Sequence, residues 1–138
     1  MRLRVLLADD DPDLRALLSA ALEADGHDVT TAANGREALD VIAPILFAEE
    51  TARAPDVIVT DVRMPGVNGL SLVAGLRACG CVTPIIVISA FEGGSLRERA
   101  EDVGATAVFA KPFEVDDFRT AVMNLAHPYF RERVPRRT

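Results

Sequence analysis

The chain is poor in the residues that brace, anchor or mark many other kinds of protein. It has two cysteines, Cys79 and Cys81, whose spacing is too short to brace a fold. Without further cysteines or clustered histidines the pair makes a poor metal site, so free thiols in a reducing cytosol are predicted. No run approaches the ~20 apolar residues of a membrane span. The apolar N-terminal run soon meets three aspartates, unlike a signal peptide. We therefore expect a cytoplasmic protein.

Lysine is nearly absent, since Lys111 is the one lysine among 15 basic residues. The formal net charge is −6, yet the segment 127–138 holds four arginines against one glutamate, a local +3 that leaves −9 for the rest. An acidic body argues against direct binding of nucleic acid by the folded part. With 138 residues, 49% of them hydrophobic, we expect one domain over 1–126 and a basic tail or linker over 127–138.

Apolar runs alternate with amphipathic segments five times along the chain. Runs with strand-like composition cover 3–8, 27–32, 57–61, 85–89 and 105–110. Between and after them the pattern predicts helices from Pro12 to about 24, from about 35 to 46, from 70 to about 78, from 95 to 102 and from 115 to 126. Such alternation predicts parallel strands joined by right-handed crossovers, an α/β fold with three layers.

Spacing along the helices predicts their buried faces. The predicted faces are Leu14, Leu17, Leu18, Ala21 and Leu22; Ala38, Leu39, Ile42 and Leu46; Leu70, Leu72, Val73 and Leu76; and Val115, Phe118, Val122, Met123 and Leu125. Pro44 should bend or split the second helix, because proline lacks the N–H and clashes with the preceding turn. A loose, exposed stretch is expected over Ala48–Ala54.

Chemically capable side chains stand where four of the five predicted strands end. They are Asp9 and Asp10, then Asp61, then Ser89, then Lys111. In an open parallel sheet the carboxyl ends of the strands share one edge, where ligands bind. Three carboxylates at one edge repel each other unless a cation lies among them, and a hard divalent ion such as Mg²⁺ suits oxygen ligands.

These residue types together favour phosphoryl chemistry. A bound cation would attract phosphoryl oxygens, Lys111 would add a compact positive charge, and Ser89 a hydroxyl donor. An aspartate facing such a group can become a covalent nucleophile. Taken alone, Asp61 and Ser89 would be turn residues, Lys111 a surface residue and Asp11 a helix cap, and for Asp11 the cap is preferred. Taken together, four strand ends that match one chemistry favour the site.

The motif strongly resembles the receiver domain of two-component response regulators. The residues that carry the resemblance are Asp9-Asp10, Asp61 followed by Met64-Pro65-Gly66 and Gly69, Ser89-Ala90, and Lys111-Pro112-Phe113, within roughly residues 3–126. The resemblance implies a flavodoxin-like (βα)5 sandwich whose five-stranded parallel sheet has the order 2-1-3-4-5. It also implies a phosphoacceptor signalling domain that catalyses only its own phosphorylation and dephosphorylation.

The same resemblance implies a role for each site residue. Asp61 would accept a phosphoryl group from a histidine kinase or a histidine phosphotransfer protein. Mg²⁺, or Mn²⁺, would be held by Asp61, by Asp10 directly, by Asp9 through a water, and by the backbone carbonyl of Arg63. Lys111 would bind phosphoryl oxygens.

The resemblance further implies how the domain would signal. Ser89 would move toward the phosphate on activation, and the Lys111–Pro112 bond is often cis in such domains. The fourth helix, last strand and final helix would form the output face toward a partner or an output domain. The domain would be a monomer or a phosphorylation-dependent dimer.

Two features depart from the family pattern, and two further positions bear on the phosphoryl lifetime. Val108 occupies the switch position three residues before the lysine, where an aromatic ring is common, and Phe109 lies beside it. Arg63 and Phe91 occupy the positions that tune phosphoryl lifetime, where they could either hinder or orient the attacking water. The segment from Gly35 to Ala54 is also longer than usual.

Two other functions compete with the receiver hypothesis. A receiver-fold interaction module that signals without phosphorylation is favoured by Val108 but opposed by the intact site residues. A haloacid-dehalogenase-type phosphatase also uses an aspartate at a strand end, but it needs a second acid two residues later, where this chain has Arg63.

Overall fold

The five predicted strands form one parallel sheet. The computed structural model describes residues 2–47, 54–90 and 94–126. Its strands are β1 (Arg4–Ala8), β2 (Asp28–Ala32), β3 (Val57–Asp61), β4 (Ile85–Ser89) and β5 (Ala107–Ala110). Every neighbouring pair is parallel and the order is β2-β1-β3-β4-β5. The structure thus confirms the α/β fold and the strand order 2-1-3-4-5.

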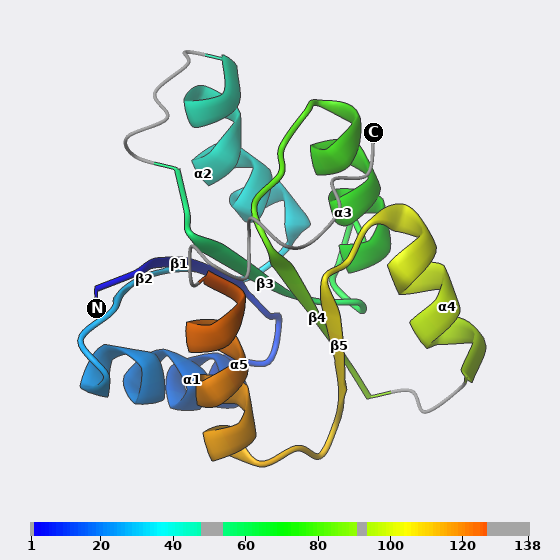
Figure 1. Ribbon diagram of the computed structural model, residues 1–138. Coiled ribbons are helices and arrows are strands. Elements are labelled where there is room, and N and C mark those ends of the chain that lie inside the picture. Colours follow the sequence, from blue (N-terminus) through cyan, green and yellow to red (C-terminus); the bar gives the residue numbers. More distant parts are fainter. Residues whose placement is uncertain (1, 48–53, 91–93, 127–138) are drawn as a thin grey trace.

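Helices cover both faces of this sheet. They are α1 (Pro12–Ala24), α2 (Gly35–Phe47), α3 (Gly69–Ala78), α4 (Gly94–Val103) and α5 (Val115–Ala126). Figure 1 shows α1 and α5 on one side of the sheet and α2, α3 and α4 on the other, which is the predicted three-layer arrangement. In the part of the chain that the structure describes, no helix is long and apolar enough to cross a membrane.

The two layers of helices bury two separate apolar clusters. Side chains alternate between the faces of a strand, so Ile58 and Val87 pack toward α2, α3 and α4. Val59 and Ile88 pack toward α1 and α5. β3 and β4 are buried at every residue, as continuous apolar runs of parallel strands predict. β2 lies at an edge of the sheet, as expected from its weaker apolar pattern.

The second helix excludes one of the two outcomes predicted for Pro44. α2 runs without a break from Gly35 to Phe47 and contains Pro44, so the proline does not split it. Proline removes the N–H that would bond the carbonyl of Asp40, but Asp40 and Pro44 are both exposed, so water can satisfy that carbonyl. Of the stretch predicted to be loose, only Ala54 lies among the described residues, where it is half-buried.

Three residues predicted on buried helix faces are exposed instead. Leu17 is 53% exposed, Leu39 is 38% exposed and Met123 is 43% exposed. Each is next in the chain to a fully buried residue (Leu18, Ala38 and Val122), so its side chain lies about 100° around the helix from that neighbour. Counting apolar residues at steps of three and four therefore predicted a stripe wider than the sheet covers.

Candidate functional site

Three aspartates converge at the carboxyl end of the sheet. One carboxylate oxygen from each of Asp9, Asp10 and Asp61 lies within 4.8 Å of the others. Asp9 follows β1 and Asp61 ends β3, and these strands are adjacent in the sheet. Asp9 and Asp61 are buried, whereas Asp10 is exposed. The predicted acidic cluster is therefore present, with one carboxylate open to solvent.

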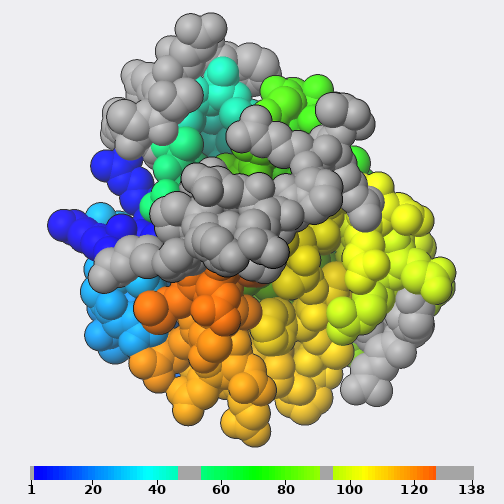
Figure 2. Space-filling view, in the orientation of Figure 1, coloured from blue at the N-terminus to red at the C-terminus, as the bar shows by residue number. Residues whose placement is uncertain are grey.

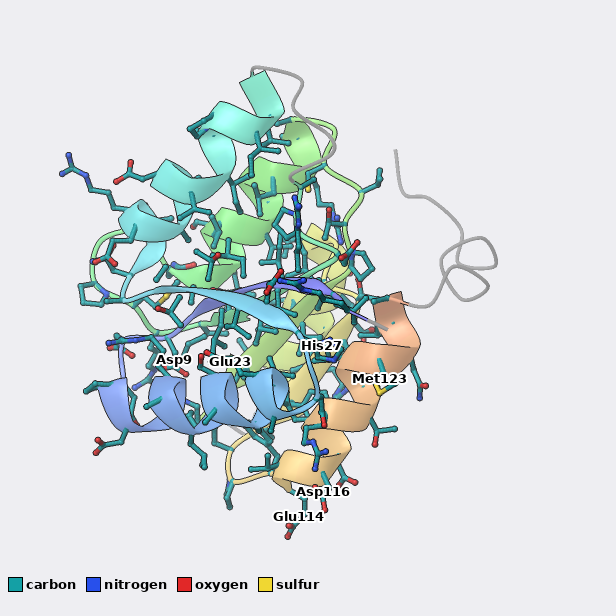
Figure 3. All side chains as sticks on the ribbon, turned by 90° about the vertical axis from the view of Figure 1, so that its left-hand side faces the viewer. Asp9, Glu23, His27, Glu114, Asp116 and Met123 are labelled. Atoms are coloured by element: carbon teal, nitrogen blue, oxygen red, sulfur yellow. The ribbon has the colours of Figure 1, made fainter. Side chains whose placement is uncertain are left out.

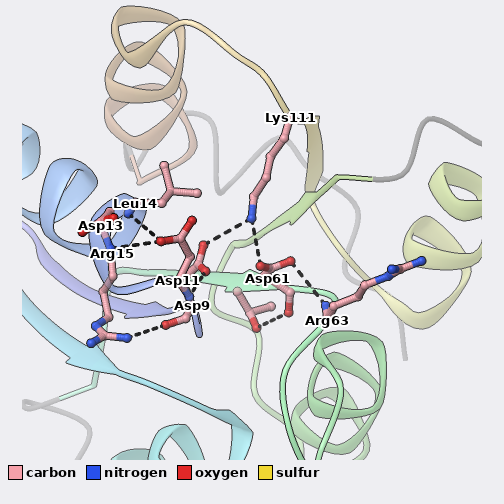
Figure 4. Close-up of polar contacts among 9 residues, drawn as sticks. Asp9, Asp11, Asp13, Leu14, Arg15, Asp61, Arg63 and Lys111 are labelled. Carbon is pink, nitrogen blue, oxygen red and sulfur yellow. Dashed lines mark hydrogen bonds and ion pairs between the residues drawn. The ribbon is translucent and has the colours of Figure 1, made fainter.

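Hydrogen bonds hold Asp9 in place on several sides (Figure 4). The Asp9 N–H donates to the Ala32 carbonyl of β2 at 3.1 Å. Arg15 of α1 donates from Nη1 to the Asp9 carbonyl at 2.8 Å, and the Asp11 N–H donates to Asp9 Oδ1 at 2.9 Å. Both the backbone and one carboxylate oxygen of Asp9 are thus fixed by neighbouring elements.

Asp11 serves as a helix cap, the interpretation preferred for it from the sequence. Its Oδ1 accepts the N–H groups of Asp13 at 3.0 Å and of Leu14 at 3.3 Å. Pro12 follows at the first helical position, where its missing N–H has no helical partner to lose. The third aspartate of the run therefore starts α1.

Lys111 brings a positive charge to the carboxylates. Its Nζ lies 2.9 Å from Asp61 Oδ2 and 3.7 Å from Asp9 Oδ2. Burial disfavours the charged ammonium, but the hydrogen bond to Asp61 and the attraction of Asp61 and Asp9 outweigh it, so the pKa of Lys111 is raised. The peptide bond from Lys111 to Pro112 is cis, as the resemblance implied.

One oxygen of Asp9 has no hydrogen-bond donor within the described residues. Asp9 Oδ2 is buried, and the 3.7 Å to Lys111 Nζ is too long for a hydrogen bond. Burial raises the pKa of the Asp9 carboxyl to about 6; the Asp11 N–H and Lys111 lower it, while the charge of Asp61 raises it. A buried, unbonded carboxylate oxygen among hard oxygen ligands fits a divalent cation such as Mg²⁺.

The loop between β3 and α3, residues 62–68, turns back closely beneath Asp61. The Gly69 N–H donates to the Val62 carbonyl at 2.8 Å, and a Cβ on Gly69 would lie 2.1 Å from the Asp61 carbonyl oxygen. Only glycine can stand there. Within the loop, Gly66 has φ +80° and the Arg63 N–H donates to Asp61 Oδ1 at 3.3 Å. The Arg63 carbonyl therefore belongs to a segment held against Asp61.

Ser89 lies at the same end of the sheet. It ends β4, is buried, and its carbonyl accepts the Lys111 N–H at 2.7 Å. The preceding residue, Ile88, is the partner of Asp61 in the register between β3 and β4. The structure thus places five residues at one edge of the sheet, as their positions at the ends of strands predicted: Asp9, Asp10, Asp61, Ser89 and Lys111.

The residues around the switch position divide between the two faces of the sheet. The half-buried Val108 packs with the cluster under α2, α3 and α4, and its carbonyl accepts Arg97 Nη2 of α4 at 3.3 Å. Phe109 points to the opposite side, with its ring 5.6 Å from that of Phe113 and 6.2 Å from that of Phe118. The ring of Phe109 therefore packs against the apolar cluster beneath α5. Phe91 lies outside the described residues.

Sequence reasoning missed two residues that support the site. Arg15 binds the Asp9 carbonyl, and Gly35 at the start of α2 approaches the loop after Asp61. For Arg15 a signal existed, because a basic residue one turn into the helix can reach back to the strand that precedes it. For Gly35 there was none, since its contact is with a residue far along the chain.

Comparison with known proteins agrees with this arrangement. A family model described as the response regulator receiver domain matches residues 5–123. The chain therefore belongs to the receiver domain family of two-component response regulators, which are signalling domains. The acidic cluster of Asp9, Asp10 and Asp61 is consistent with the binding of Mg²⁺.

Individual relatives differ in how much of their length this chain spans. The chain is 29% identical over 122 residues to sporulation initiation phosphotransferase F of Bacillus subtilis, covering 88% of this chain and 92% of that protein. It is 38% identical over 117 residues to response regulator MprA of Mycolicibacterium vanbaalenii, covering 85% of this chain and 47% of MprA. The chain thus spans about half the length of the MprA relatives.

Solved structures show the same fold. The receiver domain of Francisella response regulator 1452 superposes with a TM-score of 0.78 at 33% identity, covering 90% of this chain and 96% of that one. The chemotaxis response regulator CheY4 of Vibrio cholerae superposes with a TM-score of 0.75 at 30% identity, covering 91% and 99%. The flavodoxin-like receiver fold expected from the motif is therefore confirmed.

Proposed function

We propose that this receiver domain accepts a phosphoryl group on Asp61 in a reaction that requires Mg²⁺ or Mn²⁺. The observation that carries the proposal is the convergence of three carboxylates within 4.8 Å, with Lys111 Nζ 2.9 Å from Asp61 Oδ2. Asp61 is the member that combines burial with a direct hydrogen bond from the one lysine of the chain. The donor would be a histidine kinase or a histidine phosphotransfer protein.

The cation would be held by Asp9, Asp10, Asp61 and the Arg63 carbonyl. By analogy with the family, Asp10 would bind it directly and Asp9 mainly through a water. The exposed position of Asp10 and the unbonded Oδ2 of Asp9 support this division. A bound divalent ion supplies neutralisation of the charge on the phosphoryl oxygens.

The residues of the chain would perform the transfer by positioning and charge. A carboxylate oxygen of Asp61 attacks phosphorus, and the bond from phosphorus to the donor breaks with its electron pair leaving on the donor. Lys111 moves its N–H from Asp61 Oδ2 to a phosphoryl oxygen. Ser89 donates its hydroxyl to another, moving toward the new group as it does so. No group other than Asp61 forms a covalent bond.

The response would spread to the face formed by α4, β5 and α5, which lie next to one another in Figure 2. Ser89 is linked to β5 through the hydrogen bond from the Lys111 N–H, and Arg97 of α4 bonds the Val108 carbonyl of β5. A displacement of Ser89 would therefore reach α4 through the β5 backbone. A downstream partner, an output domain or a second copy of the domain would read this face.

Incubation with Mg²⁺ and the small phosphodonor acetyl phosphate tests the proposal. Intact-mass spectrometry should detect the addition of one phosphoryl group, which disappears with a chelator or in Asp61→Asn. A control receiver domain is labelled in parallel. An unmodified mass under conditions that label the control would overturn the proposal.

A further inference from the structure

The N-terminal end of α2 approaches the loop at residues 62–68 unusually closely. A Cβ on Gly35 would lie 2.4 Å from the Val67 carbonyl oxygen and 2.7 Å from the Val67 Cβ. Real Cβ atoms essentially never lie within 3.0 Å of a heavy atom outside their own residue and its chain neighbours. Gly35 is buried, so the absence of its side chain is what allows this helix to touch the loop backbone.

The start of α2 is firmly held and could not easily yield to a side chain at residue 35. Asn34 Oδ1 accepts the Glu37 N–H at 2.8 Å, and Glu37 Oε1 accepts the Ala33 N–H at 3.1 Å, which form a reciprocal cap. Ala32, which precedes this cap, accepts the Asp9 N–H at the end of β2. Ala38 packs in the core without exposure. The loop, not the helix, would therefore shift.

Two close glycine contacts fix the loop. Gly69, which directly follows the loop, lies beneath Asp61, where an added Cβ would be 2.1 Å from the Asp61 carbonyl oxygen. Gly35 lies against Val67, two residues before Gly69. Near the start of the loop, the Arg63 N–H donates to Asp61 Oδ1 at 3.3 Å. A shift of Val67 would therefore be transmitted toward the Arg63 backbone.

We propose that Gly35 is a positioning residue for the cation site, acting through its contact with Val67 on the loop that carries the Arg63 carbonyl. The inference rests on the proposed function, since it assigns that carbonyl to the cation. Outer groups that orient metal ligands typically change metal affinity by ~10–100-fold when they are altered. The first turn of α2 thereby supports the site through its contact with Val67.

Direct titration of the protein with Mg²⁺ by calorimetry tests the inference. Gly35→Ala should weaken Mg²⁺ binding by about tenfold. The matched control is Gly75→Ala, because Gly75 is an exposed helical glycine whose added Cβ would meet nothing within 4 Å. It should keep the wild-type affinity. In phosphorylation assays, Gly35→Ala should need more Mg²⁺ for half the maximal rate and regain most of that rate at saturating Mg²⁺.

A second pair of variants keeps the test decisive if Gly35→Ala folds poorly. Val67→Gly removes the Cβ that opposes residue 35 and loosens the loop, so on its own it should weaken Mg²⁺ binding several-fold. Combined with Gly35→Ala it should restore at most a small part of the lost affinity, because it removes the contact at the Val67 Cβ but leaves the Val67 carbonyl oxygen 2.4 Å from the added methyl. A role confined to folding would lower the melting temperature but leave the Mg²⁺ affinity unchanged.

Unchanged Mg²⁺ affinity in both Gly35→Ala and Val67→Gly would overturn the inference, while leaving the proposed function intact if the wild type is still phosphorylated. If the wild type binds Mg²⁺ and Gly35→Ala weakens that binding, the inference stands even where no phosphoryl group is accepted. The calorimetric and mass-spectrometric results therefore separate the two failures.

Discussion

At the scale of single residues, the site gathers more negative than positive charge. Asp9 and Asp61 are buried side by side. Lys111 Nζ lies 2.9 Å from Asp61 Oδ2 and 3.7 Å from Asp9 Oδ2. Asp10 adds a third carboxylate at the solvent side. One ammonium cannot neutralise three carboxylates, so the metal-free protein bears an electrostatic cost that a divalent cation would remove.

The pKa of Asp9 predicts how this cost depends on pH. In an unfolded chain an aspartate titrates near ~3.9, whereas burial raises the pKa of Asp9 in the folded protein to about 6. Its contribution to stability is fully present below the unfolded pKa and is lost as the pH rises through the folded value. Asp9→Asn should therefore stabilise the metal-free protein at neutral pH, by ~1–3 kcal/mol.

Urea unfolding in the presence of a chelator measures this effect. The stabilisation by Asp9→Asn should shrink as the pH is lowered toward 4, where the wild-type carboxyl is also protonated. Asp40→Asn, at an exposed position of α2, serves as the control. Equal or lower stability of Asp9→Asn at neutral pH would contradict the electrostatic account.

Replacing Lys111 should separate cation binding from phosphoryl transfer. Lys111→Met removes a positive charge beside the proposed cation site, so the affinity for Mg²⁺ should rise by about fivefold. Phosphorylation should become slower, because a donor to the phosphoryl oxygens is lost. Mg²⁺ titration and acetyl phosphate labelling of the same preparation measure both. A variant that weakens Mg²⁺ binding would show that Lys111 acts otherwise.

At the scale of the elements, an ion pair joins the end of α1 to α5. Arg119 Nε donates to Asp25 Oδ2 at 2.8 Å, and Arg119 Nη1 donates to Asp116 Oδ1 at 2.9 Å. Asp25 follows the last residue of α1, and its hydrogen bond from Arg119 lowers the pKa of the Asp25 carboxyl. Because α5 belongs to the proposed output face, this contact holds that face against α1.

Replacing Asp25 by asparagine should destabilise the fold only at pH values at which the Asp25 carboxylate is charged. A lowered pKa means that the stability contributed by Asp25 is present above the unfolded pKa and is lost as the pH falls through the folded one. Asp25→Asn should lower the melting temperature at pH 7, with a smaller difference at pH 3. The exposed Asp117→Asn in α5 is the matched control. A difference that persists undiminished at pH 3 would show that the charge is not responsible.

The two sides of α5 should respond very differently to truncation. Phe118 has no exposed surface and contacts the rings of Phe109 and Phe113, whereas Met123 is 43% exposed. Phe118→Ala should lower the free energy of unfolding by ~3–5 kcal/mol, and Met123→Ala by less than ~1 kcal/mol. Denaturant unfolding of the two variants tests this. Similar losses would mean that α5 packs differently.

At the scale of the whole molecule, the residues of the proposed site lie together at one end of the sheet. Figure 3 labels Asp9 and His27 at opposite ends of α1, so the site occupies one end of the sheet only. β1 and β3 lie side by side although β2 intervenes in the chain, and this reversal of strand order places Asp9 and Asp61 next to each other.

Much of this arrangement could be predicted from the sequence, for a physical reason. A parallel sheet sends the ends of all its strands to one edge, so Asp9, Asp61, Ser89 and Lys111 could be grouped without knowing a distance. The contact between Gly35 and Val67 could not be predicted, because it depends on how closely α2 packs onto a distant loop. The exposure of Leu17 and Met123 could not be predicted either, because the spacing of apolar residues does not show how far the sheet extends beneath a helix.

Trapping the phosphorylated residue with borohydride tests the central claim most directly. Borohydride reduces an aspartyl phosphate to homoserine, and tandem mass spectrometry of the peptides then locates the change. After treatment with acetyl phosphate and Mg²⁺, we predict homoserine at residue 61 and unchanged aspartate at residues 9 and 10. Homoserine at either of those positions, or none at all when a control receiver is trapped, would contradict the account.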